Sequence, residues 1–135
     1  MTTLNEARDA VYERFLTQWG VTTPLTFDNE AFDPPSDGSA WIRISVRNEF
    51  GQQASLGPPG QRRFDRFARV FVQIFTKPDT GLKEADTLAT LAQGIVEAVS
   101  FDGLRFKSGS IREVGVSDGW QSHLVDVPFD YQETK

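Results

Sequence analysis

Apolar residues at the start of the chain recur at the spacing of a helix. Between residues 4 and 19 they return every three or four positions, which places them on one helical face. Thr3 and Glu6 fit a capping box, in which each side chain accepts a hydrogen bond from the other residue's backbone N–H. Gly20 is a natural helix end. We expect a helix over residues 4–19 with a buried face that includes Leu4, Ala7, Val11 and Phe15.

A second helical pattern lies between residues 82 and 99. Small alanine side chains in its apolar stripe would let this helix lie close to a sheet. The turn sequence Pro78-Asp79-Thr80-Gly81 precedes it, and we expect Asp79-Thr80-Gly81 to cap the first turn. The helix should end near Ser100.

Two stretches have the pattern of strands. Residues 41–47, WIRISVR, alternate strictly, which indicates a half-buried strand. Residues 62–76, RRFDRFARVFVQIFT, carry four arginines in the first half and are apolar on both faces in the second, which is typical of a central strand. We expect Ala68, Val70, Val72 and Ile74 to face the helices, with Phe67, Phe71 and Phe75 on the far side.

The segment between these strands, residues 48–61, is predicted to be a long mobile connection. It contains Gly57-Pro58-Pro59-Gly60, a flexible turn sequence. Together with the flanking strands it would form an extended β-hairpin arm. Loops of this length in small domains are usually functional or become ordered on binding. The candidate assembly positions in the arm are Gly51, Leu56, Gly57, Pro58, Pro59 and Gly60.

Turn chemistry separates the first helix from the first long strand. Residues 21–27 are predicted to be a short extended piece. Residues 28–40 contain Pro34-Pro35 and Asp37-Gly38, which predict a loop.

Short strands complete the C-terminal third. Residues 104–107 should be extended. The segments 111–116 and 120–131 flank Ser117-Asp118-Gly119, which is a hairpin signal. Pro128 cannot donate to a neighbouring strand, and this favours a sheet edge or a strand end.

The predicted order of elements is α-β-β-β-α-β-β-β. This order predicts an α+β fold, with residues 1–135 as a single domain around one mostly antiparallel or mixed sheet. Both helices should pack on one face, and the long arm should extend from the sheet. The far face would stay partly bare, and a bare apolar face of that size is usually an interface.

Composition narrows the class of protein. The chain has 135 residues, of which 39% are hydrophobic and 24% charged, and this suits one soluble domain with one core. No apolar run approaches the roughly 20 residues that cross a bilayer, so no membrane contact is expected. The N-terminus lacks a signal-peptide pattern, and the absence of cysteine excludes disulfides. These features fit synthesis in a cytoplasm.

The net charge of −5 is unevenly spread. Residues 1–42 hold two basic and seven acidic side chains, residues 43–69 six arginines and two acids, and residues 70–135 six basic and ten acidic side chains. A basic middle between acidic ends suits pairing with another copy or another protein, because arginine binds carboxylates bidentately. A solvated strand face and a nucleic-acid contact stay open as alternatives, although an acidic chain repels phosphate over long range.

No residue pattern indicates catalysis, a metal or a cofactor. His123, the only histidine, follows Ser122 in a predicted strand, where adjacent side chains point to opposite faces. We interpret it as a structural histidine. The acidic residues between 28 and 37 lack the spacing of a calcium loop, and Gly57-Pro58-Pro59-Gly60 lacks the lysine of a phosphate loop. We therefore expect a protein that is not an enzyme.

Six phrases are spread along nearly the whole chain: LNEARDAVYERFL, TPLTFDNEAFDPP, WIRISVR, VFVQIFTKPDTG, KEADTLATLAQGIVEAVSFDGLRF and DVPFDYQE. They resemble a family of small bacteriophage proteins, the tail-terminator-like proteins. The resemblance implies a structural virion protein that forms a ring, commonly of six subunits, on the last ring of the tail tube. Such a ring stops tube growth and offers a docking surface to the head connector. Related proteins occur in gene transfer agents, and the family fold is an α/β domain with flanking helices.

The resemblance also implies partners and a location. The partners would be further copies of the chain, the tail tube protein and the head–tail connector or stopper protein, with weak non-specific contact to DNA in the lumen. The location would be the head-proximal end of a virion tail, assembled in the host cytoplasm. A head-closure or neck protein, or another tail tube relative, is the close alternative, because fold does not determine position in a particle. Two more distant classes stay open: an interaction module outside any virion, and a module that binds single-stranded nucleic acid.

A ring requires one patch of a subunit to meet a different patch of its neighbour. The basic middle and acidic ends of this chain suit such head-to-tail pairing. The basic and apolar side of this interface is expected to comprise Arg43, Arg47, Arg62, Arg63, Arg66, Phe67, Arg69 and Phe71, and the acidic side Glu30, Asp33, Asp126 and Asp130.

Overall fold

A computed structural model describes residues 2–135 of the chain. It confirms the expected α+β class, and its sheet is mixed because β1 runs parallel to β2 whereas the other strand pairs are antiparallel. The elements are α1 (Leu4–Trp19), β1 (Leu25–Phe27), β2 (Trp41–Gln53), β3 (Arg63–Thr76), α2 (Lys83–Val96), β4 (Ser100–Phe101), β5 (Leu104–Phe106), β6 (Ser110–Ser117) and β7 (Trp120–Thr134).

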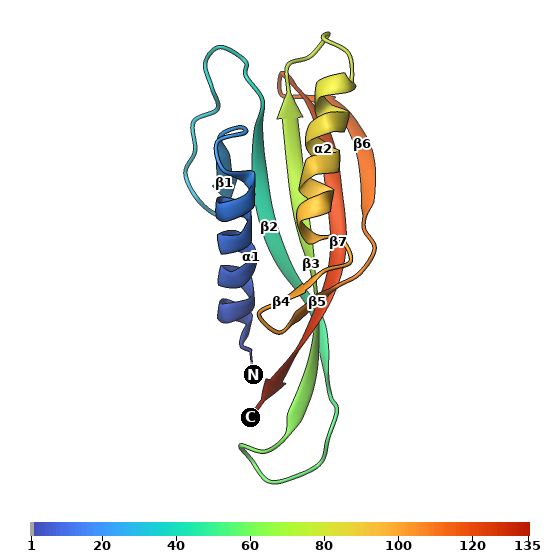
Figure 1. Cartoon of the computed structure of the whole chain (residues 1–135). Helices are drawn as coiled ribbons and strands as arrows, with labels where there is room; N and C mark the ends of the chain where they lie inside the picture. The colour runs from blue at the N-terminus through green and yellow to red at the C-terminus, as the bar shows by residue number, and fades with distance from the viewer. Residues whose placement is uncertain (1) are drawn as a thin grey trace.

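The strands form one curled sheet, and both helices lie on the same face of it (Figure 1). The strand order is β1-β2-β3-β7-β5-β4. β6 also pairs with β7, on the same edge as β5 but along a different part of the strand. β3 and β7 are the central pair, with matched residues from Arg63↔Thr134 to Thr76↔Gln121. The hairpin predicted at Ser117-Asp118-Gly119 is confirmed, since β6 and β7 meet there.

The core lies between the helices and the sheet. The four β3 residues predicted to face the helices, at positions 68, 70, 72 and 74, are at most 1% exposed. They share one apolar cluster with Phe15 of α1, Ala89 of α2 and Val127 of β7. Full burial of such side chains contributes about 1.5–3 kcal/mol each, so this layer is the main source of stability.

α1 has the predicted bounds and the predicted cap. The Glu6 N–H donates to the Thr3 hydroxyl at 3.3 Å, and the Glu6 carboxylate accepts from the Thr3 N–H at 3.2 Å. The helix ends at Gly20, whose φ of +60° disfavours any residue with a Cβ. The Thr2 N–H donates to the Gln132 carbonyl oxygen at 3.0 Å, which ties the start of α1 to β7.

α2 begins later than the sequence pattern indicates. The expected cap at Asp79-Thr80-Gly81 is wrong, because the first helical residue is Lys83 and Leu82 before it makes no side-chain cap. The Thr80 hydroxyl instead donates to the Lys77 carbonyl oxygen at 2.8 Å and closes a turn outside the helix. The packing of α2 on the sheet decides its start, since the apolar stripe begins to contact the core at Ala85.

α2 also ends before the expected boundary near Ser100. Its last residue is Val96, because Glu97 is already extended, with a φ of −78° and a ψ of 130°, and Ala98 after it has a φ of +53°. The Glu97 carboxylate accepts the Gly109 N–H at 2.7 Å, so the chain after α2 is held against the start of β6.

Pro128 lies in the middle of the sheet, so its expected place at an edge or a strand end is wrong. It faces Arg69 in the central β3–β7 pair. Its carbonyl oxygen accepts the Lys107 N–H at 2.9 Å, on the side away from β3. The N and C=O of one extended residue point to the same side, so the missing N–H falls in the gap between β5 and β6 and costs no β3–β7 bond.

The arm differs most from the sequence-based expectation. Residues 48–53 are not a mobile connection but the distal half of β2, which pairs with β3 as far as Gln53↔Phe64 across a bulge between Asn48 and Phe50. Every residue from 47 to 53 is exposed. Their sequence shows no alternation because backbone pairing, not burial, holds them in the sheet.

We define the arm as residues 48–67, and its tip as the connection of residues 54–62 between β2 and β3. β7 pairs with β3 alongside the arm as far as Arg63↔Thr134, so the arm is three-stranded up to its tip. In Figure 1 the arm extends past the ends of both helices, and no helix covers it.

Two glycines provide a matched test of packing. A Cβ at Gly109 would lie 2.5 Å from Cγ2 of the buried Val127 and 3.1 Å from the Asp126 carbonyl oxygen. We expect Gly109→Ala to lower the free energy of unfolding by about 1–3 kcal/mol through overpacking. Gly94 lies in α2 with nothing within 4 Å of an added Cβ, so Gly94→Ala should raise that free energy by about 0.5–1 kcal/mol. Urea unfolding followed by tryptophan fluorescence measures both changes, and an unchanged midpoint for Gly109→Ala would contradict this account.

Candidate subunit interface

The face of the sheet away from the helices, here called the far face, is covered by no helix (Figure 1). At the end opposite the arm it carries an aromatic cluster built around Trp41. This ring stacks on Phe75 at 4.2 Å and on Phe32 at 4.9 Å between centroids, and Trp120 meets it edge-on at 6.0 Å. Phe32 belongs to the acidic loop of residues 28–40, which therefore folds over the far face and leaves Trp41 only 4% exposed.

Arg43 lies beside the aromatic cluster with its charge unpaired. Its guanidinium carbon is 5.3 Å from the centre of the Trp41 ring, within the range of a cation–π contact. Among residues 2–135, Arg43 has no carboxylate within ion-pair distance. Its positive charge is therefore available to a partner.

Asp126 lies on the far face, but its carboxylate is already paired within the chain. The side chain is 7% exposed and contacts Arg69 at 2.9 Å and Arg112 at 3.2 Å. Arg69 also pairs with Glu49 at 3.1 Å. The hydrogen bond to Asp126 and its negative charge raise the pKa of Arg69 above the ordinary value. A buried carboxylate requires such partners. Asp126 and Arg69 therefore form an internal ion pair of the chain.

Asp130 is satisfied in the same way. Its side chain is 8% exposed and contacts Arg105 at 2.6 Å and Lys107 at 3.2 Å, both from the short β5 region. Asp126 and Asp130 thus hold neighbouring strands together on the far face, where no apolar layer does so.

Two more of the predicted arginines are paired inside the chain. Arg47 contacts Asp28 at 2.7 Å, and Arg66 contacts Glu133 at 3.0 Å. Gly51 lies in β2 rather than in a flexible connection, and a Cβ there would come within 2.6 Å of the Arg66 guanidinium. The absence of a side chain at Gly51 therefore lets Arg66 lie flat across the arm.

The remaining candidates gather mainly in two places at opposite ends of the sheet. Glu30 and Asp33 lie on the loop over the aromatic cluster and make no ion pair within the described chain, residues 2–135. Arg62 and Arg63, at the base of the arm tip, likewise make none there. Phe67 stacks on Phe50 at 4.5 Å on the arm. Phe71 lies half-buried midway along the far face.

The arm tip has defined backbone contacts. The Ala54 N–H donates to the Arg63 carbonyl oxygen at 2.7 Å, and the Arg63 N–H donates to the Ser55 hydroxyl at 2.9 Å. The Gln61 N–H donates to the Pro58 carbonyl oxygen at 3.0 Å, which closes a turn around Pro58-Pro59-Gly60. Leu56 is nevertheless 92% exposed, an apolar side chain with nothing to bury it.

Phe64 collects positive charge on the opposite side of the arm. The cationic groups of Arg66, Lys135 and Arg62 lie 5.0, 5.5 and 5.9 Å from the centre of its ring. Arg62, Phe64 and Arg66 are already close together in the sequence, but Lys135 joins them only because its backbone pairs with Arg62 across the sheet.

His123 is fully buried on the helix side of β7, and its Nε2 lies 2.9 Å from the Asp86 carboxylate of α2. No sequence pattern indicates this partner, because Asp86 lies on another element. With Glu113 of β6 these side chains form a group whose ligand atoms lie within 4.8 Å of one another, a spacing that a metal ion could use. A metal is not needed to explain this group. A buried histidine requires a hydrogen-bond partner, which Asp86 provides, and exposed carboxylates such as that of Glu113 are common without an ion.

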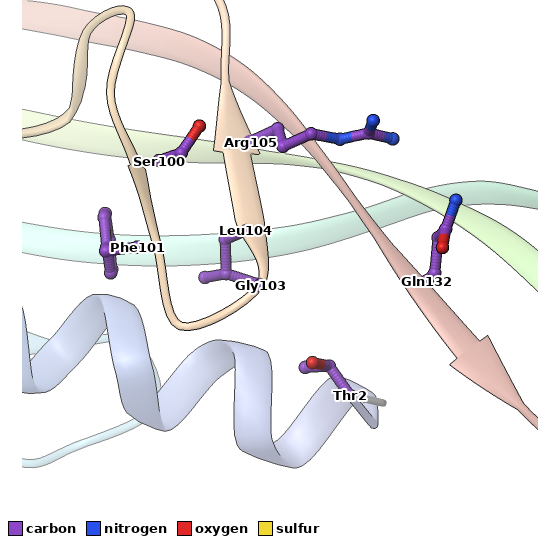
Figure 2. Close-up of a pocket in the computed structure, with 7 residues that line it drawn as sticks. All are labelled: Thr2, Ser100, Phe101, Gly103, Leu104, Arg105 and Gln132. Carbon is purple, nitrogen blue, oxygen red and sulfur yellow. The ribbon is translucent and has the colours of Figure 1, made fainter.

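A shallow hollow of about 450 Å³ lies between the start of α1, the β4–β5 hairpin and the end of β7 (Figure 2). Its charged lining residue, Arg105, extends away from the other side chains toward its partner Asp130. No nucleophile and base lie together in this lining, so it offers no arrangement for catalysis. The lining residues are Thr2, Ser100, Phe101, Gly103, Leu104, Arg105 and Gln132.

Comparison with known proteins informs the fold only. No protein-family model and no curated protein sequence matches the chain. One solved structure, whose name states no function, has a TM-score of 0.65 and 16% sequence identity, covering 95% of this chain and 97% of that one. At this identity the likeness establishes a shared architecture across the whole chain and nothing about activity. No helix of residues 2–135 is long and apolar enough to span a membrane.

Charge reversal should distinguish the arginines that are paired within the chain from those that are not. Arg69→Glu would place a carboxylate beside Asp126 and Glu49, and we expect it to lower the free energy of unfolding by about 1–3 kcal/mol. Arg63→Glu is the matched control, since it breaks no ion pair of the described chain and should change stability by less than about 0.5 kcal/mol. Chemical unfolding of both variants tests this, and equal losses would contradict the assignment.

Proposed function

We propose that this chain is a structural ring protein of a phage-like tail, a tail terminator that caps the tail tube. One observation carries the proposal: the arm projects beyond the core and presents an exposed Leu56 at its tip and Arg63 with no ion pair in the described chain. An apolar tip that its own chain leaves exposed suits contact with another molecule. The assignment to a phage-like particle, and to the end of its tail tube, is based on the sequence resemblance to tail-terminator-like proteins.

The distribution of unpaired charge supports a ring rather than a symmetric dimer. Within residues 2–135, the arm carries the unpaired Arg62 and Arg63 and one unpaired acid, Asp65. The opposite end of the sheet carries the unpaired Glu30 and Asp33 on the loop of residues 28–40, beside the unpaired Arg43. Two different, complementary patches on one subunit produce head-to-tail contacts, and such contacts close into a ring when the rotation between subunits permits. The family resemblance favours six subunits.

The proposed partners follow from that position. The ring would bind the last ring of tail tube protein on one side and the head–tail connector or stopper protein on the other. Arginines that line the lumen would give weak, non-specific contact with the DNA passing through it. The protein would be assembled in the host cytoplasm and reside at the head-proximal end of the tail. A head-closure or neck protein is the close alternative.

The cations around Phe64 favour a second candidate, single-strand nucleic-acid binding. An aromatic ring with three positive groups within 6 Å is a small version of a base-stacking platform. This function predicts an affinity for oligonucleotides that falls steeply with salt and is lost in Phe64→Ala. Binding that is absent at low salt would eliminate it.

The experiment that tests the proposed function is electron microscopy of particles from a phage or gene transfer agent lacking this gene. We expect abnormally long, headless tails, because nothing would stop tube growth. Supplying the native gene in trans should restore tail length, and supplying Arg63→Glu should not.

Normal-length tails beside unattached, DNA-filled heads would overturn the terminator role and place the protein in head–tail joining. Normal, infectious particles would remove it from the virion altogether.

A further inference from the structure

A second hollow, of about 520 Å³, opens on the far face beside the aromatic cluster. It lies at the end of the sheet opposite the arm tip, where β3 ends and β7 begins. Apolar walls with a few polar groups are typical of a binding site. The walls include Pro34, Trp41, Arg43, Phe75, Val114 and Trp120.

The hollow has one charged donor group without an acceptor. The Trp41 indole N–H has no partner in residues 2–135 either, but it is itself buried, so the accessible donor is the guanidinium of Arg43. The Arg43 guanidinium, next to it, makes no ion pair in the described part of the chain. A ligand that brought carbonyl oxygens into the hollow would therefore give the Arg43 guanidinium the acceptors that the chain does not provide.

Proline-containing segments have the matching chemistry. Their rings pack well against aromatic walls, and each proline brings a carbonyl acceptor but no competing N–H. The chain carries such a segment at its arm tip, Leu56-Gly57-Pro58-Pro59-Gly60, and all five residues are exposed.

The tip cannot enter the hollow of its own chain. Arg63 at the base of the tip and Phe75 in the hollow are twelve residues apart on one strand, a separation of about 40 Å. The occupant must come from a second molecule.

We propose that the arm tip of one copy, led by Leu56, Pro58 and Pro59, docks into the aromatic hollow of the next copy. This inference rests on the proposed function, because it assigns the contact that joins neighbouring subunits of the ring. Each copy gives one tip and receives one, so the contact is head-to-tail and repeats around the ring.

Charge favours the same pairing. Arg62 and Arg63 follow the tip, whereas Asp118 lines the hollow and the loop that supplies Pro34 also carries Glu30 and Asp33. As the tip enters, Arg62 and Arg63 of one copy would approach these carboxylates of the next. The Arg43 guanidinium in the same hollow would then face the backbone carbonyl oxygens of the tip.

Cysteine cross-linking tests the contact cleanly because the chain has no cysteine of its own. Leu56→Cys protein is mixed with Ser117→Cys protein, whose new thiol would line the hollow. Leu91→Cys, on the exposed side of α2, is the matched control for a distant surface. We expect the mixed disulfide with Ser117→Cys to form at least about tenfold faster than with Leu91→Cys, because docking raises the effective thiol concentration. Equal rates would overturn the proposal.

A peptide of residues 53–63, added in trans to the full chain, provides a measurement that does not require a ring. We expect saturable quenching or enhancement of tryptophan fluorescence, with binding at least about tenfold weaker when leucine 56 of the peptide is replaced by aspartate. No saturable binding at millimolar peptide, or equal binding of the two peptides, would overturn the inference.

The two proposals fail separately. Long tails in the gene-deleted particles together with no peptide binding would overturn the docking contact and leave the terminator role intact. Peptide binding together with normal tails would support the contact and overturn the role.

Discussion

Backbone pairing of β3 on both of its sides is the interaction on which the rest of the structure depends. β2 and β7 follow β3 almost from end to end, so the three strands hold together where side chains contribute little. In the half near α2, apolar side chains of β3 are buried under the helices. In the other half the same strands continue without a covering layer and become the arm. One strand thus belongs to the core at one end and to a projection at the other.

The middle of the far face is held by ion pairs, and an aromatic cluster packs only at the end opposite the arm. Asp126 and Asp130 are nearly buried there and are neutralised by Arg69, Arg112, Arg105 and Lys107 from the adjoining strands. These pairs use up the charges in the middle of the face. Of the described residues, those that remain unpaired lie toward its ends: Arg63 and Asp65 on the arm, and Arg43 with the loop acids Glu30 and Asp33 near Trp41. The polarity of the molecule, and with it the head-to-tail character of the proposed ring, is a consequence of this internal pairing.

The sequence predicts those features that arise from residues close together along the chain. The bounds of α1 and its Thr3–Glu6 cap agree with the sequence pattern, and the β3 residues at even positions from 68 to 74 face the core as expected. The extension of β2 is not predictable, because residues 48–53 have no alternation and are held by a distant strand. The position of Pro128 escapes prediction for a similar reason. Its missing donor is harmless only because β5 and β6 leave a gap beside it, and no local pattern indicates that gap.

By itself, the sequence determined the class of fold, the apolar faces of both helices and of β3, and the basic middle between acidic ends. Tertiary structure alone decided which charges are paired inside the chain. Arg69 meets Asp126 across 57 residues and His123 meets Asp86 across 37, and both contacts depend on strand register and on where α2 lies over the sheet. Alternation with a period of two tells which face a side chain occupies but not which residue lies opposite it. The partner of each charge therefore exists only once the strands have paired.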